Sequence, residues 1–161
     1  MFNGSLHETI LPVYAGSALT TVALNPAQRV SLKNCTWLTA VVQINNATTV
    51  TGRAVTLKQS SAVAGTGEKA LAFSQAWRTI DAGATNVLSV FTVTSNTFTS
   101  DTTDSKRLLY VIEVNPAALD VAGGFDVFAV DVAAGAASGV DVLYLMQMAY
   151  GGATVPSVIV D

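Results

Sequence analysis

The stretch AVAGTGEKALAF, residues 62–73, places two glycines one residue apart with a lysine close behind them. Glycines let a backbone fold around a phosphate and a lysine can neutralise it, so this spacing raises the question of nucleotide chemistry. A phosphate-binding loop ends in Gly-Lys-Ser/Thr, whereas Glu68 here separates the glycine from Lys69, and Ala70 replaces the hydroxyl that would bind magnesium. A dinucleotide fingerprint also needs a third glycine between a strand and a helix. We therefore predict a glycine-rich connection between two antiparallel strands.

The single cysteine and single histidine offer little for covalent catalysis or for a metal. Cys35 lies in KNCTWLTAVV, a context that suits a small buried apolar side chain. A thiol nucleophile needs a nearby base, and His7 lies in an N-terminal segment that is predicted to be an arm. One Cys and one His do not supply the ligand cluster of a zinc site, and one Cys excludes an intramolecular disulfide. We expect no enzymatic activity, no metal and no cofactor.

Acidic residues are scattered along the chain. Asp101 and Asp104 lie in the loop TSDTTDSK, whose oxygens suit weak calcium binding, although a solvated turn is the commoner interpretation. Asp126 and Asp131 are an odd number of residues apart in one predicted strand, so they fall on opposite faces and make a poor general acid–base pair. A carbohydrate-active enzyme is a third hypothesis, and it requires a cleft that holds two carboxylates.

The two tryptophans have two interpretations. Trp37 and Trp77 can form a platform on which sugar rings stack, or they can be core aromatics of a β-sandwich, which is the commoner use of such residues. Together with loops rich in Asn, Asp and Thr, the first interpretation makes a carbohydrate- or receptor-binding module the alternative function.

Only 12% of the residues are charged, about half of the usual ~25%. Half are hydrophobic, which argues against a disordered chain. The net charge is −3 and no basic residues cluster, so we expect no binding to nucleic acid and none to an anionic membrane surface. A surface so poor in charge favours permanent assembly, because obligate interfaces are depleted in charge, with a Thr- and Ser-coated monomer as the alternative.

The stretch VLYLMQMAYGGATVPSVIV has 19 residues without a charge. It contains Gln147, a Gly-Gly pair and Pro156, so a strand followed by a tail explains it better than a membrane span. The N-terminus lacks the basic and apolar regions of a signal peptide. We expect no contact with a membrane.

Period-2 alternation of β-branched and aromatic residues, punctuated by turn residues, predicts about eight strands. One of them, 70–80, also fits a short helix, and NPAALD predicts a helical turn capped by Asn115 with Pro116 at its first position. With almost no helix between strands, the expected fold is all-β: an antiparallel β-sandwich, and a jelly roll in particular. The predicted strands are 27–34, 38–44, 55–58, 70–80, 86–94, 107–114, 125–132 and 140–150.

We predict a single domain over residues 1–161, with an N-terminal arm at 1–16, a sandwich body at 17–150 and a C-terminal tail at 151–161. Apolar side chains in both end segments are expected to dock on a neighbouring molecule, with packing on their own sandwich as the alternative. These partner-contact candidates are Phe2, Leu6, Ile10, Leu11, Tyr14, Val155, Val158, Ile159 and Val160.

Two segments resemble parts of a known family. VTLKQSSAVAGTGEKALAF (55–73) is similar to a strand, glycine turn and strand in the capsid cement, or decoration, proteins of tailed bacteriophages. VIEVNPAALDVAGGFDVFAVDVA (111–133) resembles a second segment of that family, with its Asp-x-x-x-Gly-Phe-Asp core at 120–126. The last strand, VLYLMQMAYGG, looks like the family's closing strand.

The resemblance implies a structural protein of the virion without a cofactor. Such proteins are jelly rolls that bind as homo-oligomers, here a dimer or a trimer, to the outer surface of the phage head. There they bridge copies of the major capsid protein and stabilise the shell. The chain would be made in the host cytoplasm and end on the capsid exterior. A tail-associated or host-attachment module that binds carbohydrate is the alternative.

Overall fold

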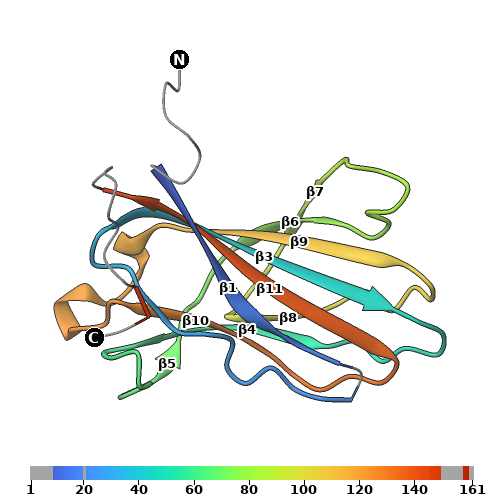
Figure 1. Ribbon diagram of the computed structural model, residues 1–161, viewed down its shortest axis with the longest axis horizontal. Helices are drawn as coiled ribbons and strands as arrows, with labels where there is room; N and C mark the ends of the chain where they lie inside the picture. The colour runs from blue at the N-terminus through green and yellow to red at the C-terminus, as the bar shows by residue number, and fades with distance from the viewer. Residues whose placement is uncertain (1–8, 20, 150–157, 160–161) are drawn as a thin grey trace.

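The fold of the computed structural model is a sandwich of two antiparallel sheets, described for residues 9–19, 21–149 and 158–159 (Figure 1). One sheet has the strand order β1-β11-β3-β9-β6-β7, and the other has β2-β10-β4-β5, with β8 also paired to β4. The all-β prediction is therefore confirmed. The strands are β1 (Ile10–Ala18), β2 (Val30–Ser31), β3 (Cys35–Asn46), β4 (Ala54–Ser60), β5 (Lys69–Ala70), β6 (Gln75–Thr79), β7 (Ser89–Thr92), β8 (Thr97–Thr99), β9 (Arg107–Val114), β10 (Val127–Val132) and β11 (Ser138–Met148).

The strand order is that of a jelly roll. Successive strands from β1 to β4 alternate between the two sheets, and so do β9, β10 and β11. If β6 and β7 are left aside, the first sheet has the order β1-β11-β3-β9 and the second has β2-β10-β4. β5 and β8 together take the place of a fourth strand in the second sheet. Two nested Greek keys of this kind define the jelly roll, so the finer prediction also holds.

The fourth strand of the second sheet is interrupted at Leu57. The Leu57 carbonyl accepts a hydrogen bond from the N–H of Leu71 at 3.0 Å, and its N–H donates to the carbonyl of Asn96 at 2.8 Å. β5 lies on one side of this point along β4 and β8 on the other. Residues 72–95 leave the sheet here, add β6 and β7 to the other sheet, and return.

Two buried tyrosines span the core between the sheets. Tyr144 of β11 accepts a hydrogen bond on Oη from the N–H of Val130 of β10 at 3.0 Å. Tyr110 of β9 accepts one from the N–H of Asp101, just after β8, at 2.8 Å. Phe128 of β10 packs edge-on against Tyr144 with ring centroids 5.5 Å apart. Each phenol oxygen of the six-stranded sheet therefore accepts a hydrogen bond from a backbone N–H in or next to a strand of the other sheet.

Arg53 is wholly buried and directly precedes β4. Its Nη1 donates to the carbonyls of Val22 at 2.8 Å and Ala133 at 3.0 Å, and its Nη2 donates to those of Leu19 and Ser138. Its Nε donates to the Ser138 hydroxyl at 2.9 Å. The guanidinium thus ties together three connections, and all five acceptors are neutral oxygens. Burial lowers its pKa.

The N-terminal arm prediction is wrong for residues 10–16. They belong to β1, which pairs with β11 along its length. Ala15 is buried and Leu11 packs against the core, so the strand has an apolar inner face despite Pro12. The sandwich body therefore begins at residue 10, seven residues before the predicted boundary of 17.

Other local predictions have mixed outcomes. The strand at 107–114 is confirmed, whereas 27–34 contains only the two-residue β2. The alternative helix at 70–80 is wrong, because β6 occupies its second half. The turn at NPAALD is confirmed as η1 (Pro116–Ala118), with the Oδ1 of Asn115 accepting from the N–H of Ala117 at 2.9 Å.

A second short 3₁₀ turn, η2 (Val121–Gly123), follows η1. No helix in the described part of the chain is both long enough and apolar enough to cross a membrane.

Candidate functional site

The two segments that carry the family resemblance meet in space at one end of the sandwich. Lys69 of β5 forms an ion pair of 2.5 Å with Asp120, and its ammonium lies 3.7 Å from the centroid of the Phe125 ring. The Gln59 side chain of β4 also accepts a hydrogen bond from the N–H of Asp120 at 2.8 Å. The connection after β4 and the segment before β10 are therefore held together as one surface.

A chain of alternating charges crosses the outer face of the second sheet beside this surface. Glu68 lies between Arg29 and Lys58, with one oxygen 2.7 Å from each cation, and Lys58 also pairs with Asp131. Burial opposes both charges most strongly, but the hydrogen bonds and charge attraction outweigh it. The pKa of Glu68 is therefore lowered and that of Lys58 raised. Glu68 therefore pairs with the two cations beside the glycine turn, Arg29 and Lys58.

The glycines of the same stretch shape its turn. Gly65 and Gly67 both have positive φ, of 87° and 64°, which side chains rarely adopt. A Cβ on Gly65 would lie 2.6 Å from the guanidinium carbon of Arg29. The prediction of a glycine-rich connection between antiparallel strands is thereby confirmed, since β4 and β5 pair on either side of it.

Replacing Glu68 with glutamine is expected to lower the free energy of unfolding at pH 7 by about 1–2 kcal/mol, because the carboxylate accepts three charge-assisted hydrogen bonds from Arg29 and Lys58. The lowered pKa means that the unfolded chain takes up the proton first as the pH falls, so this stabilisation is present above the unfolded value of roughly 4.3 and disappears below it. Urea unfolding at pH 7 and pH 3 measures both effects. The exposed Glu113 has no partner within the described residues, so Glu113→Gln is the control, and an equal loss in the two variants would contradict the network.

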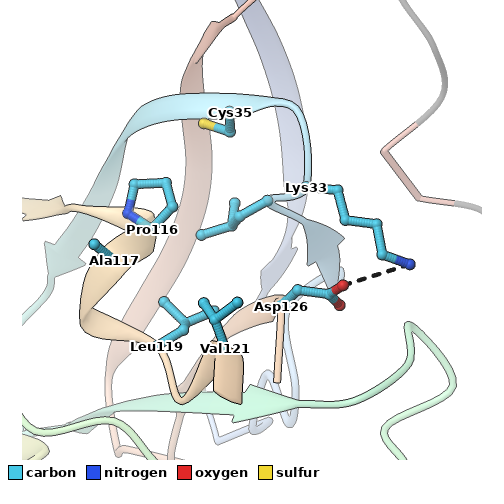
Figure 2. Close-up of a pocket in the computed structure, with 8 residues that line it drawn as sticks. Lys33, Cys35, Pro116, Ala117, Leu119, Val121 and Asp126 are labelled. Carbon is cyan, nitrogen blue, oxygen red and sulfur yellow. Dashed lines mark ion pairs between the residues drawn. The ribbon is translucent and has the colours of Figure 1, made fainter. Parts of the chain in front are cut away.

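A cavity of about 300 Å³ lies between the β2–β3 connection and the η1–η2 segment (Figure 2). Pro116, Leu119 and Val121 line it with apolar surface, and Figure 2 shows the ion pair of Lys33 and Asp126, 3.4 Å apart, at one side.

Cys35 also lines this cavity, but its thiol is poorly suited to act as a nucleophile. Burial raises its pKa more than its hydrogen bonds to backbone lower it. The thiol donates to the carbonyl of Trp37 at 2.9 Å. The thiolate is the reactive form, so little of it exists at neutral pH.

Both tryptophans line a second hollow, of about 350 Å³, on the outer face of the six-stranded sheet. They are half-buried rather than in the core, so the core interpretation does not hold for this pair. Glu113 of β9 lies between their rows, because Trp77 is paired with Val111 and Trp37 precedes the Leu38 that is paired with Val114. The remaining lining residues are Ala72, Phe73, Ser74, Gln75, Asn115 and Ala118. We refer to this hollow as the tryptophan groove.

The carboxylates of the loop TSDTTDSK are bound to their own surroundings. The Asp101 side chain accepts hydrogen bonds from both the N–H and the hydroxyl of Thr103, and the first of these bonds is 2.8 Å long. The Thr103 hydroxyl is the main cause of the lowered pKa of Asp101. Asp104 accepts from the N–H of Val50 at 3.2 Å. Across residues 9–19, 21–149 and 158–159, no three His, Cys, Asp or Glu side chains gather as metal ligands would.

The predicted partner-contact residues of the N-terminal segment divide into two groups. Ile10 and Leu11 are half-buried in β1, so they are part of the sheet and not of an arm. Tyr14 is 64% exposed on the outer face of the same strand, which leaves it available to a partner. Four of the nine candidates lie outside the described residues: Phe2, Leu6, Val155 and Val160.

The described part of the C-terminal tail packs on its own sandwich. Val158 is buried, and its carbonyl accepts a hydrogen bond from the N–H of Ser31 of β2 at 2.7 Å. The docking prediction is therefore wrong for Val158, because the chain itself covers this side chain. Ile159 is 45% exposed.

The strongest exposed apolar surface was not among the predicted contacts. Ile80, Val87, Leu88 and Val90 are all exposed in or beside the β6–β7 hairpin, which stands out from the sandwich at the upper right of Figure 1. The alternation in residues 86–94 correctly predicts a strand, which is β7, but alternation does not say which strand of a sheet lies at its edge. Residues 82–100 carry no charge, but neither do residues 34–52 and 142–160, so the sequence holds no signal that singles out this segment.

No protein-family model, curated protein or solved structure matches the chain.

Proposed function

We propose that this protein is a capsid decoration protein of a tailed bacteriophage, which binds as an oligomer to the outside of the head and bridges major capsid protein subunits. The resemblance of segments 55–73 and 111–133 supports the proposal, and these two segments form one surface through Lys69 and Asp120. The observation that supports self-association is the unpaired edge of strand β7.

Sheet edges normally carry features that prevent pairing with other chains. β1 has Pro12 and a bulge between Tyr14 and Gly16. β2 and β5 are two residues long, and β5 contains Lys69. β7 has neither proline, bulge nor charge, and exposes Val90 at its centre. An unprotected, apolar edge of this kind is a surface for another strand.

The edge of β7 is complementary to itself. Val93 donates to the carbonyl of Ser74 in β6–β7 pairing, and antiparallel pairs alternate, so Val90 and Thr92 direct their backbone N–H and C=O outward. Two copies related by a two-fold axis at Val90 place Leu88 opposite Thr92 of the second copy. No like charges meet, because residues 82–100 are uncharged.

An oligomer suits a cement protein because of mass action. A protein that binds only the expanded shell stabilises that state by RT ln(1 + [L]/Kd) for each site. Two linked copies raise the effective concentration at the second site and multiply this gain.

The Val90→Lys variant is expected to be monomeric, since lysine at the centre of an edge opposes pairing. Light scattering after gel filtration should give the native chain twice its 16.6 kDa mass and the variant the single mass. Val121→Lys is the matched control, because Val121 is exposed to 60% and Val90 to 59%. A native chain that stays monomeric at all concentrations contradicts the edge model.

Binding to the shell is measured separately. Native protein added to expanded heads that lack it should cosediment saturably with them and raise their resistance to heat, and Val90→Lys should occupy fewer sites at the same concentration. Absence of binding by the native protein would refute the decoration function, whatever its oligomeric state.

A further inference from the structure

We propose that the tryptophan groove binds a neutral oligosaccharide, a function separate from attachment to a shell. Trp37 comes from β3, Trp77 from β6, and Glu113 from β9 between them, so adjacent strands of one sheet face build the groove. Neighbouring strands fix these three side chains in register, and the connections that flank them complete the lining with Ala72, Phe73, Ser74, Asn115 and Ala118.

The spacing of the tryptophans suits a ligand longer than one sugar ring. Trp77 is level with Val111 of β9, and Trp37 lies one residue beyond the pair formed by Leu38 and Val114. The two rows are therefore four residues apart, or roughly 13 Å along the strands, and two strand spacings, or roughly 10 Å, separate them sideways. A ligand that contacts both indoles must extend across the groove, as a chain of linked rings does.

The polar groups of the groove are free to bind hydroxyls. The side chains of Ser74, Gln75 and Glu113 and both indole N–H groups have no hydrogen-bond partner within the described residues. Asn115 uses its Oδ1 to accept from the N–H of Ala117, which leaves its amide donors. A sugar presents an apolar C–H face to an aromatic ring and several hydroxyls at its rim, and it can satisfy both kinds of surface at once.

The charge of the groove limits the class of glycan. Among the described residues that line the groove, Glu113 is the one ionisable side chain, so phosphorylated or acidic sugars meet a like charge there. A carboxylate accepts two hydroxyl hydrogen bonds and favours neutral sugars with adjacent hydroxyls. A proline-rich peptide also docks in aromatic grooves, but it leaves most of these polar groups without a partner.

The chain reports on this site without a label, because its two tryptophans both line the groove. We would titrate the full chain with maltohexaose, cellohexaose and chitohexaose up to about 10 mM, a range that detects millimolar dissociation constants, and follow indole emission. At least one neutral probe should shift the emission saturably. Hexagalacturonic acid is the acidic comparison and decaproline the peptide comparison. Both are expected to bind at least about tenfold more weakly than the best neutral probe.

Variants locate the binding on the groove. Trp37→Ala and Trp77→Ala should each weaken the best probe about tenfold or more, and the tryptophan that remains still reports. Glu113→Gln, which keeps the shape, should weaken it severalfold. Tyr14→Ala removes an exposed aromatic from the same sheet face outside the groove and should leave the affinity unchanged. Circular dichroism checks that each variant is folded.

Three outcomes would overturn the proposal. The first is that no neutral probe gives a saturable change. The second is that Glu113→Gln and both tryptophan variants bind the best probe with the same affinity as the native chain. The third is that decaproline or hexagalacturonic acid binds more strongly than every neutral probe. None of them depends on heads or on oligomeric state, so the groove and the decoration function can fail separately.

Discussion

Replacing Arg53 with methionine is expected to lower the free energy of unfolding by about 3–5 kcal/mol, because four carbonyls and the buried Ser138 hydroxyl lose the donors of one buried guanidinium at once. Methionine has a similar stem and fills the space, so the loss reports on hydrogen bonds rather than on a cavity. Urea unfolding at pH 7, followed by tryptophan emission, measures it. Arg53→Lys is expected to recover only part of the loss, since an ammonium has three donors and lacks the planar fork that reaches three connections.

A matched control separates this effect from loss of a positive charge. Arg107 is exposed, and its side chain has no partner within the described residues, so Arg107→Met should change stability by no more than about 0.5 kcal/mol. If Arg53→Met and Arg107→Met are equally stable, the network around Ser138 does not hold the loops together.

Tyr144 is expected to make stability fall steeply at high pH. Burial raises the pKa of its phenol far above the ordinary value. The unfolded chain therefore releases this proton first, from about pH 10. Above that point the free energy of unfolding falls by up to about 1.4 kcal/mol per pH unit. The pKa of Tyr110 is raised by burial in the same direction. Urea midpoints between pH 8 and pH 11.5 measure the slope.

The Tyr144→Phe variant isolates this contribution. At pH 8 it should be less stable by about 1–3 kcal/mol, because the buried N–H of Val130 loses its acceptor. That deficit should shrink as the pH rises above 10, since the variant has no phenol to ionise. Tyr14→Phe removes an exposed hydroxyl and should stay within about 0.5 kcal/mol of the native chain at pH 8. A deficit that stays constant up to pH 11.5 would show that Tyr144 ionises alike in both states.

The strands that could be predicted are runs of β-branched and aromatic residues without proline or glycine. Residues 107–114 are rich in β-branched and aromatic residues without proline or glycine, and they form β9 at the predicted bounds. β1 contains Pro12 and Gly16, which are residues typical of loops, so its sequence does not indicate a strand. Its edge position makes both tolerable, because the sheet pairs with only one side of it.

The site was less predictable because its contacts are distant in sequence. The pairing of Lys69 with Asp120 spans 51 residues, and no local pattern specifies it. The residue types of the tryptophan groove were visible, but Trp37 and Trp77 become neighbours of one groove only because β9 lies between β3 and β6. Arg53 gave no signal, since a lone arginine near a predicted turn is normally exposed.

The interruption of a jelly-roll strand at Leu57 bears on how such a molecule can diversify. Both junctions of segment 71–96 meet on this one residue of β4, so the segment can be lengthened or replaced without shifting the register of the other strands. The same insert carries Trp77 and all of β7. A single recombination event at this place would therefore exchange the proposed glycan contact of Trp77 and the proposed dimer edge of β7 together, while the eight-strand scaffold is inherited unchanged.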